Sequence, residues 1–376
     1  MKKREFIKYG LACTGGLYMN LPPLSAFQSF YQMENNMNDV NRRIEARYVI
    51  ETPKGLRCLI CPNECTLQEG ELSDCKNRRV IDGKLYALGY GSPCAIHADP
   101  VEKKPLLHYY PTMPVLSFGV AGCNFTCLNC QNSEISQVSP EETQNIDASP
   151  EDIVQTAVEN GYPAIAYTYT EPISFFEFTY DTAVLAKKAG IRNILISNGY
   201  VNPKPLKDLV PFIDAANIDL KIFDDETYQR LTGGKLDPVL KTINYLKEKN
   251  VWLEITNLII PGWTDDMDTI KKMCKWLVSN NLKDTPLHFS RFHPAYKLNK
   301  VKSTPLKSLL KARDIALEAG IEYVYIGNVP EIEGENTYCH KCNKMLIKRQ
   351  GFNVISNELK NGCCPECSSK IPGVWN

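Results

Sequence analysis

Residues 122–132 read Gly-Cys-Asn-Phe-Thr-Cys-Leu-Asn-Cys-Gln-Asn, so that Cys123, Cys127 and Cys130 are separated by three residues and then by two. A cubane cluster of four irons is normally held by four thiolates, and a loop this short can wrap three of its corners. The fourth iron would then be free to bind a substrate. A zinc site or a group of buried free thiols is the alternative explanation of this spacing.

An apolar run stands directly before these cysteines. Residues 115–120, Val-Leu-Ser-Phe-Gly-Val, have the length and composition of a buried strand. The cysteines are therefore expected on the loop that leaves the carboxyl end of that strand. In α/β barrels, catalytic residues are placed at this end of the strands.

The cysteine loop resembles the signature of the radical S-adenosylmethionine (SAM) enzymes, in which the amino and carboxylate groups of SAM chelate the fourth iron. Two flanking stretches, residues 99–106 (Asp-Pro-Val-Glu-Lys-Lys-Pro-Leu) and residues 130–137 (Cys-Gln-Asn-Ser-Glu-Ile-Ser-Gln), resemble the radical SAM member of the AmmeMemoRadiSam group. That group is similar to the pyruvate formate-lyase activating enzymes, which are glycyl-radical activases. The ending, residues 371–375, resembles the group as well, so the likeness runs from about residue 57 to the C-terminus.

Strand-like and helix-like stretches alternate from residue 113 to residue 328, which predicts βαβ units with a parallel sheet. The first helix has Ser149 as N-cap, Pro150 at its first position, Asp152 to close a capping box and Gly161 after its end. The expected architecture is α/β, a partial (βα) barrel of the TIM type. Its later strands are predicted at residues 164–169, 193–197, 216–221, 252–260, 287–292 and 321–326.

Polar residues stand at the ends of five of these strands. They occur at residues 169–172 (Tyr-Thr-Glu-Pro), 197–200 (Ser-Asn-Gly-Tyr), 219–221 (Asp-Leu-Lys), 261–266 (Pro-Gly-Trp-Thr-Asp-Asp) and 291–294 (Arg-Phe-His-Pro). One such motif is weak evidence, since an Asn-Gly pair is usually a turn and an Asp-x-Lys pair is usually a surface ion pair. Five in phase predict one functional rim.

The resemblance implies SAM contacts for the first two motifs. Tyr169, Thr170 and Glu171 stand where many radical SAM proteins have Gly-Gly-Glu, the edge that meets the amino group of SAM. Asn198 corresponds to a contact near the ribose.

The other three motifs are given roles in the same way. Asp219 and Lys221 correspond to a pair beside SAM, and His293 to a histidine beside the sulfonium; a rim ion pair and a packed histidine are the alternatives. Residues 261–266 match the fifth-strand turn of the activases. Those activases carry an arginine shortly before this turn, whereas residues 254–260 here contain none.

A second group of cysteines, Cys58, Cys61, Cys65 and Cys75, precedes the core within eighteen residues. Four thiols this close can form one metal site, holding either zinc or a second iron–sulfur cluster. Disulfides are the alternative for an exported protein. The group that the chain resembles usually has a glycine two residues before the last cysteine, where Ser73 stands here.

A third group forms two pairs near the C-terminus. Cys339 and Cys342, and Cys364 and Cys367, have the spacing of two zinc knuckles of a ribbon, although the 21 residues between the pairs are slightly more than usual. Cys363 offers an alternative ligand, and His340 is a weaker candidate than the cysteines beside it. Disulfides or free thiols are the alternative.

These patterns divide the chain into a leader and linker (residues 1–45), a four-cysteine module (46–112), a radical SAM core (113–328) and a zinc-ribbon-like tail (329–376). Lys plus Arg equals Asp plus Glu at 43 each, without a long basic run, which argues against a nucleic-acid partner. No apolar stretch approaches the ~20 residues of a membrane-spanning helix.

Residues 2–17 resemble a twin-arginine (Tat) export signal with lysine in place of the first arginine. An unstructured basic N-terminus or a vestigial leader is the alternative. Eleven of the fifteen cysteines fall into the three groups, and metal thiolates favour a reducing compartment. SAM and strong reductants are cytoplasmic supplies too, so the chemistry favours the cytoplasm over Tat-type export.

The sequence thus predicts an enzyme, a radical SAM oxidoreductase similar to the pyruvate formate-lyase activating enzymes. The resemblance implies reductive cleavage of SAM to methionine and a 5′-deoxyadenosyl radical that abstracts hydrogen. It also implies a protein substrate or a Memo- or AMMECR-type partner, and a reductant such as flavodoxin or ferredoxin. A radical SAM enzyme for a small molecule and a non-catalytic iron–sulfur and zinc protein are the alternatives, although the second leaves the five strand-end motifs unexplained.

Overall fold

The computed structural model describes residues 44–329 and 332–375. These residues belong to one compact unit that begins at Arg42. The predicted leader, with its twin-arginine-like stretch, lies outside the described residues.

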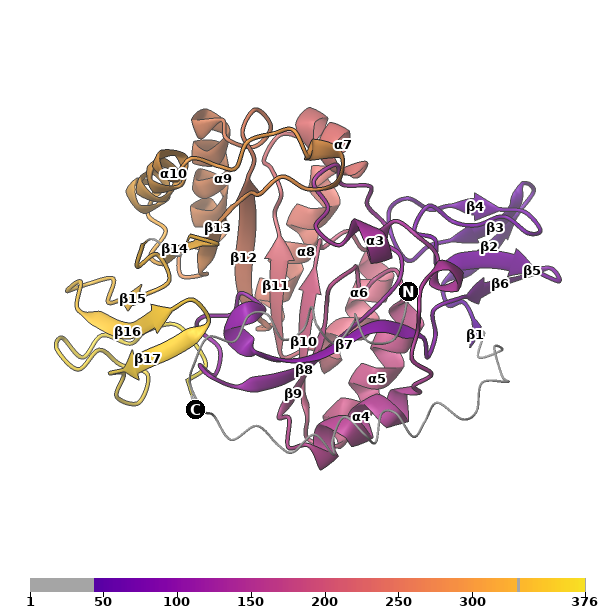
Figure 1. Ribbon diagram of the computed structural model, residues 1–376, viewed down its shortest axis with the longest axis horizontal. Coiled ribbons are helices and arrows are strands. Elements are labelled where there is room, and N and C mark those ends of the chain that lie inside the picture. The colour runs from indigo at the N-terminus through magenta and orange to yellow at the C-terminus, as the bar shows by residue number, and fades with distance from the viewer. Residues whose placement is uncertain (1–43, 330–331, 376) are drawn as a thin grey trace, which may run out of the picture. The chain divides into compact units, whose positions relative to one another are not determined.

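An eight-stranded sheet forms the core, in the order β14-β13-β12-β11-β10-β9-β8-β7 (Figure 1). Its strands are β7 (Pro93–Pro100), β8 (Pro114–Val120), β9 (Ala164–Tyr167), β10 (Arg192–Ser197), β11 (Ala215–Asp219), β12 (Trp252–Ile259), β13 (Leu287–Arg291) and β14 (Val324–Gly327). Every neighbouring pair from β8 to β14 is parallel, and β7 pairs antiparallel with β8. The parallel strands follow the order of the chain, so their carboxyl ends meet at one edge.

Helices connect these strands and cover one face of the sheet (Figure 1). They are α3 (Ser133–Ser136), α4 (Pro150–Glu159), α5 (Phe176–Lys188), α6 (Pro203–Leu209), α7 (Asp225–Thr232), α8 (Leu236–Glu248), α9 (Met267–Ser279) and α10 (Leu306–Ala319). Short 3-10 turns lie at Val101–Lys103, Pro140–Glu142, Val210–Phe212 and Tyr296–Leu298.

The alternation of side chains along each strand separates two apolar layers. Phe118 and Tyr167 belong to the large buried cluster that includes helix residues such as Ala183 of α5. Val115 and Ala164 point to the other face, where they pack in a smaller cluster with Leu106. Both faces of the parallel sheet are therefore covered by apolar residues, which explains the nearly continuous apolar composition of the strands.

The predicted strands of the core are confirmed in type and order. The largest shift is in the last of them, expected from residue 321 but formed by Val324–Gly327. The first helix is also confirmed. Ser149 Oγ accepts from the N–H of Asp152 at 3.2 Å, and Asp152 Oδ2 accepts from the N–H of Ser149 at 2.7 Å. Gly161 follows with φ +69°, a conformation that suits glycine after a helix end.

Residues N-terminal to the core form two small sheets and one strand of the large one. The small sheets contain β1 (Ile44–Glu45), β5 (Arg78–Ile81) and β6 (Lys84–Ala87), and β2 (Val49–Thr52), β3 (Gly55–Cys58) and β4 (Thr66–Leu67). Strand β7, which the sequence places with the N-terminal module, joins the core sheet. Its two prolines and lack of apolar alternation give no sign of that pairing.

The C-terminal tail forms a three-stranded antiparallel sheet next to β14 (Figure 1). Its strands are β15 (Thr337–Tyr338), β16 (Met345–Gln350) and β17 (Asn353–Asn357). Arg349 of β16 is buried, and its guanidinium donates to the carbonyl oxygen of Leu107 at 2.6 Å and to Thr337 Oγ1 at 2.7 Å. These bonds attach the tail to the segment that follows β7.

We expect Ser149→Ala to lower the free energy of unfolding by about 1 kcal/mol, because the first turn of α4 loses its capping hydroxyl. Urea denaturation followed by circular dichroism measures the change. Ser279→Ala is the matched control, since the Ser279 hydroxyl is exposed and bonds to the carbonyl oxygen of Trp276 in the last turn of α9. Equal denaturation midpoints for the two variants would contradict the importance of this cap.

Candidate functional site

The Cys123–Cys130 loop follows β8 directly and is held by the end of α7. The backbone N–H groups of Thr126 and Leu128 donate to the carbonyl oxygens of Thr232 and Leu231, at 2.8 and 2.9 Å. Gly234, just past α7, lies against the Phe125 ring, where an added Cβ would be 2.2 Å from a ring carbon. The loop has little regular structure of its own, so α7 fixes its path.

Hydrogen-bonding groups contact two of the three sulfurs, and a cation lies near the third. The N–H of Phe125 donates to Cys123 Sγ at 3.4 Å, and Cys130 Sγ lies 3.0 Å from Ser136 Oγ. Burial raises the pKa of Cys127 to about 11, although the nearby Lys221 ammonium lowers it. A metal bound here would stabilise the three thiolates together with these groups.

Glu171 lies fully buried beside this loop and connects two strand ends. Its carboxylate accepts from Ser197 Oγ at 2.7 Å and from the N–H groups of Asn198 and Ile173 at 2.8 and 3.1 Å. Burial raises the pKa of Glu171 to about 7, while these hydrogen bonds lower it. Glu171 thus fixes the geometry of the rim by joining the β9 and β10 ends.

Asn198 extends this connection to the cysteine loop. Its Nδ2 donates to Asn124 Oδ1 at 2.8 Å and lies 4.0 Å from Cys123 Sγ, while its Oδ1 accepts from the N–H of Tyr200 at 2.8 Å. Asn124 in turn donates from Nδ2 to the carbonyl oxygen of Tyr200 at 2.8 Å. The structure therefore brings together Glu171, Asn198 and Cys123, as the strand-end motifs predict.

Tyr169 and Thr170 are held by neighbouring strands. The Tyr169 hydroxyl donates to Asp99 Oδ2 at 2.7 Å, and Thr170 Oγ1 donates to the carbonyl oxygen of Val120 at 2.6 Å. Lys104, nearly buried, also pairs with Asp99 at 2.7 Å and lies over the Tyr169 ring. Residues from the 99–106 stretch thus meet the rim at Tyr169.

Asp219 and Lys221 form an ion pair of 3.0 Å next to Cys127. Burial lowers the pKa of the Lys221 ammonium, but the charges of Asp219 and Cys127 raise it above its ordinary value. Lys221 is therefore a permanent cation at the cysteine loop. The pair is partly exposed and can exchange partners with a charged ligand.

The two remaining motifs, at residues 291–294 and 261–266, make hydrogen bonds that do not involve the three cysteines. His293 is exposed, with Nδ1 3.3 Å from Ser303 Oγ. In the 261–266 turn, Asp265 Oδ1 accepts from the N–H of Gly262 at 2.8 Å, and Asp266 caps α9 by accepting from the N–H of Thr269 at 2.7 Å. These two acidic residues stabilise the turn and the helix that follows it.

Tyr228 is a residue of this site that the sequence analysis did not find. Its hydroxyl is completely buried and has no hydrogen-bond partner in the described structure, and its electrostatic neighbours include Lys221 and Cys127. A donor of this kind suits a sulfur-rich anionic group beside Cys127. The sequence around Tyr228 does not indicate a role in the site, because a tyrosine in a helix such as α7 is usually an ordinary core residue. The donors around the three cysteines therefore fit an iron–sulfur cluster.

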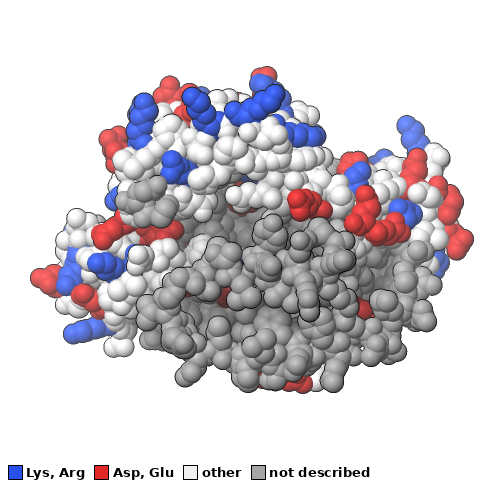
Figure 2. Space-filling model, viewed as in Figure 1, with Lys and Arg blue, Asp and Glu red and all other residues white. Residues whose placement is uncertain are grey.

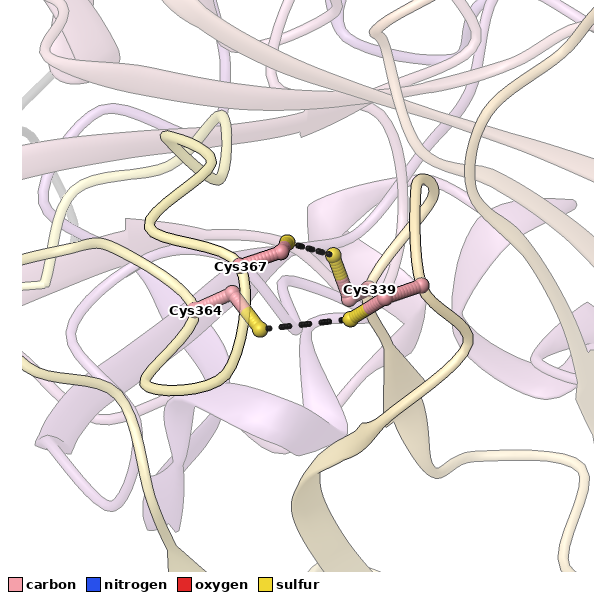
Figure 3. Close-up of side chains that lie close together, drawn as sticks. Cys339, Cys364 and Cys367 are labelled. Atoms are coloured by element: carbon pink, nitrogen blue, oxygen red, sulfur yellow. Dashed lines mark hydrogen bonds between the residues drawn. The ribbon is translucent and has the colours of Figure 1, made fainter.

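The four C-terminal cysteines form a compact group (Figure 3). The sulfurs of Cys339 and Cys367, and those of Cys342 and Cys364, are 3.6 Å apart, and all four lie within 4.8 Å of one another. A disulfide requires about 2.05 Å between sulfurs, so these thiols are not disulfide-bonded. Among residues 44–329 and 332–375, this is the group of side chains spaced to hold a single metal ion.

The alternative ligands in the tail lie outside that group. Cys363 pairs through its backbone with Lys360 and Lys370, and His340 Nδ1 lies 2.8 Å from the Tyr323 hydroxyl. The N-terminal cysteines are free thiols as well, with Cys58 and Cys75 buried. Ser73 Oγ lies 3.1 Å from Cys75 Sγ and accepts from the N–H of Arg78 at 3.1 Å.

Residues 119–276 match the radical SAM superfamily. An uncharacterized protein of Methanocaldococcus jannaschii is 46% identical over 318 residues, which are 84% of this chain and 95% of that protein. The chain therefore contains a radical SAM domain, and this family implies a [4Fe-4S] cluster and SAM as cofactors.

Activating enzymes are more distant relatives. The pyruvate formate-lyase 1-activating enzyme of Escherichia coli is 28% identical over 156 residues, which are 40% of this chain and 63% of that enzyme. A putative glycyl-radical enzyme activating enzyme of M. jannaschii is 28% identical over 214 residues, 55% of this chain and 76% of that protein. The chain is thus homologous to activating enzymes at low identity, and it spans less than two thirds of the E. coli enzyme.

Charges on the visible described surface are mixed. Lys and Arg side chains stand among Asp and Glu over α9 and α10 in Figure 2. Within the part of the chain that the structure describes, no helix has the length and apolarity needed to cross a bilayer.

We expect Cys364→Ala to lose one metal ion per chain, because it removes a sulfur from the compact group. Cys363→Ala is the matched control and should keep the ion. Elemental analysis after purification without chelator measures both. Equal metal content in the two variants would show that the four sulfurs do not act as the ligands.

Proposed function

We propose that this protein is an activase-like radical SAM enzyme of the AmmeMemoRadiSam group, with a protein as its hydrogen donor. In this proposal Cys123, Cys127 and Cys130 hold the [4Fe-4S] cluster, and the open parallel sheet is a partial (βα) barrel. The observation that carries the proposal is the three-cysteine loop at the carboxyl end of β8, tied by Asn198 and Glu171 to the next two strand ends.

The bound cluster supplies one electron to SAM, which yields methionine and the 5′-deoxyadenosyl radical. The residues around it bind and orient. Lys221 is suited to pair with the carboxylate of SAM and Asp219 with its positive groups, since the pair lies beside Cys127 and is partly exposed. Tyr169, Thr170 and Glu171 are proposed to shape the edge that meets the amino group.

Asn198 and His293 are given different roles, because Asn198 is buried and His293 is exposed. Asn198 is buried and bonded on both amide atoms, so we propose that it positions the loop near the ribose. His293 is exposed at the same rim, where it is proposed to approach the sulfonium when SAM fills the site.

We also propose zinc for Cys339, Cys342, Cys364 and Cys367. Four sulfurs at about 2.3 Å from a tetrahedral zinc lie about 3.8 Å from one another, and the 3.6 Å pairs are close to that spacing. In this proposal the zinc stabilises the tail that docks on the core.

A low-potential electron donor of the flavodoxin or ferredoxin class is the proposed reductant.

A radical SAM enzyme that acts on a small molecule is the second candidate. The limited similarity to activating enzymes favours this candidate, because proteins that are 28% identical over 40% of the chain can act on different substrates. A non-catalytic protein is a weaker explanation, since it gives no reason for the Lys221–Asp219 pair beside the cysteine loop.

We expect replacement of Cys123, Cys127 and Cys130 together by alanine to abolish 5′-deoxyadenosine formation with dithionite, because the cluster that binds SAM loses its ligands. Chromatography of the products measures the loss. Cys94→Ala is the matched control, since Cys94 is partly buried and its thiol bonds to the carbonyl oxygen of Gly119. A wild-type rate in the triple variant would remove this site assignment.

We expect hydrogen to be abstracted from a second polypeptide. Deuterated Memo- and AMMECR-type proteins, tested one at a time in single turnovers, should transfer deuterium to 5′-deoxyadenosine, which mass spectrometry detects. A deuterated metabolite extract with unlabelled proteins is the control. Deuterium from the extract and from none of the proteins would support the small-molecule candidate instead.

A further inference from the structure

We propose that Cys58, Cys61, Cys65 and Cys75 hold a second iron–sulfur cluster, with Arg78 as its buried counter-ion, in contact with the loop of Cys123. This site is separate from the one proposed to bind SAM, and its existence can be tested when that site is destroyed.

The first three cysteines lie at the end of β3, in the connection that follows it and just before β4. The N–H of Cys58 donates to the carbonyl oxygen of Cys65 at 3.0 Å, and the N–H of Glu64 donates to the carbonyl oxygen of Cys61 at 3.1 Å. The Cys65 thiol donates to Asp74 Oδ2 at 3.4 Å, in the residue before Cys75. The segment of Cys75 therefore lies against the connection that carries the other three thiols.

The four thiols have little contact with solvent. Cys58 and Cys75 are buried, and Cys61 and Cys65 are partly buried. A coordinating metal deprotonates such thiols, so a bound metal gives the four cysteines a common role.

Arg78 adds the observation that points to an anionic sulfur group. Its side chain is 2% exposed, and Nη2 lies 2.8 Å from Glu177 Oε2. Nη2 is thus paired with that carboxylate, whereas Nη1 has no hydrogen-bond partner in the described structure. A guanidinium is always charged, and Cys58 and Cys75 are among the electrostatic neighbours of Arg78. The buried cation therefore keeps one donor free beside the thiols.

Unpartnered N–H groups of a buried cation are costly. The thiolates and sulfides of a cluster would accept these hydrogen bonds. Hydrogen bonds to sulfur and nearby charge are also what sets the reduction potential of iron–sulfur clusters. Arg78 would thus offset the additional negative charge that a cluster takes on when it is reduced.

The C-terminal cysteines of the same chain provide a comparison. Cys342 and Cys367 are exposed, and Cys367 Sγ lies 3.2 Å from the hydroxyl of Ser369. That group has the sulfur spacing of a single ion, and solvent reaches two of its ligands. A buried arginine with one free donor, Nη1 of Arg78, distinguishes the N-terminal site, as expected for a centre whose charge changes.

The turn of the first three cysteines is bonded to the loop that we assign to the SAM-binding cluster. Asn63, between Cys61 and Cys65, donates from Nδ2 to the carbonyl oxygen of Asn124 at 2.9 Å. Asn202, shortly after the β10 end, donates from Nδ2 to the carbonyl oxygen of Cys61 at 3.2 Å. The same rim thus holds both cysteine loops.

Cys75 touches the SAM-binding loop directly. Its carbonyl oxygen lies so close to Gly122 that an added Cβ there would be 2.4 Å away, and Gly122 has φ +100°. Asn77 donates from Nδ2 to the carbonyl oxygen of Ala121 at 2.8 Å. Only glycine allows this approach beside Cys123. Zinc has no redox chemistry, so of the two candidates only an iron–sulfur cluster could pass an electron to the adjacent loop.

The test uses the full chain with Cys123, Cys127 and Cys130 all replaced by alanine, reconstituted anaerobically with iron and sulfide. We expect about four irons and four sulfides per chain, with an electron paramagnetic resonance signal after reduction. Adding Cys58→Ala and Cys75→Ala should remove both. Zinc in place of iron, or no metal at the N-terminal site, would overturn the proposal.

The role of Arg78 is tested in the same triple variant. Arg78→Gln should make reduction of the remaining cluster about tenfold less favourable, a fall of about 59 mV in its one-electron midpoint potential. Arg79→Gln is the matched control, because Arg79 is the next residue and pairs with Glu141 at the surface. Equal potentials would overturn the role of Arg78, and Arg78→Lys provides the comparison if the glutamine variant does not fold.

These outcomes are independent of the proposed function. Iron in the triple variant together with no SAM cleavage by the wild-type protein would disprove the proposed function and leave the second cluster in place. SAM cleavage by the wild-type protein with no iron in the triple variant would do the reverse.

Discussion

The buried carboxylate of Glu171 is the constraint on which the arrangement of the rim depends. It accepts hydrogen bonds from Ser197 and Asn198, and so joins the ends of β9 and β10. Asn198 then fixes Asn124 next to Cys123. A cysteine loop without regular structure needs such external bonds, because its own backbone cannot hold three sulfurs in a fixed geometry. Glu171 therefore has a structural function in this chain.

The parallel sheet explains why the strands and the grouping of the site residues could be predicted from the sequence. The strands of the core are continuous apolar runs, and the loop that leaves each one must reach the common edge of a parallel sheet. The convergence of Glu171, Asn198 and the cysteines follows from that topology alone. The position of β7 did not follow, because an edge strand with Pro93 and Pro100 at its ends has no periodic pattern.

Long-range partners were also beyond the sequence. Tyr169 bonds to Asp99, 70 residues earlier, and Arg78 pairs with Glu177. Neither pair has a local spacing that a pattern could reveal. In both cases a strand residue supplies a buried charge, and only the folded chain shows what that charge faces.

Glu254 lies in β12, in the stretch 254–260 that contains no arginine. Its buried carboxylate accepts from the N–H groups of Leu107 and His108, at 3.0 and 2.8 Å, and lies 2.6 Å from His288 Nε2. Burial raises the pKa of Glu254, but His288 and these hydrogen bonds lower it below its ordinary value. Glu254 is therefore an anion that holds the segment between β7 and β8.

The segment between β7 and β8 also binds the C-terminal tail. Burial lowers the pKa of His108 to about 4, so its ring is neutral. His108 Nδ1 donates to the carbonyl oxygen of Pro372, and Nε2 is left to accept from the Tyr325 hydroxyl. An arginine in place of Glu254 would bury a second positive charge near Arg349 and leave the two N–H groups without an acceptor. Glu254 is thus one of the buried polar groups through which the segment that holds the tail is attached to the core sheet.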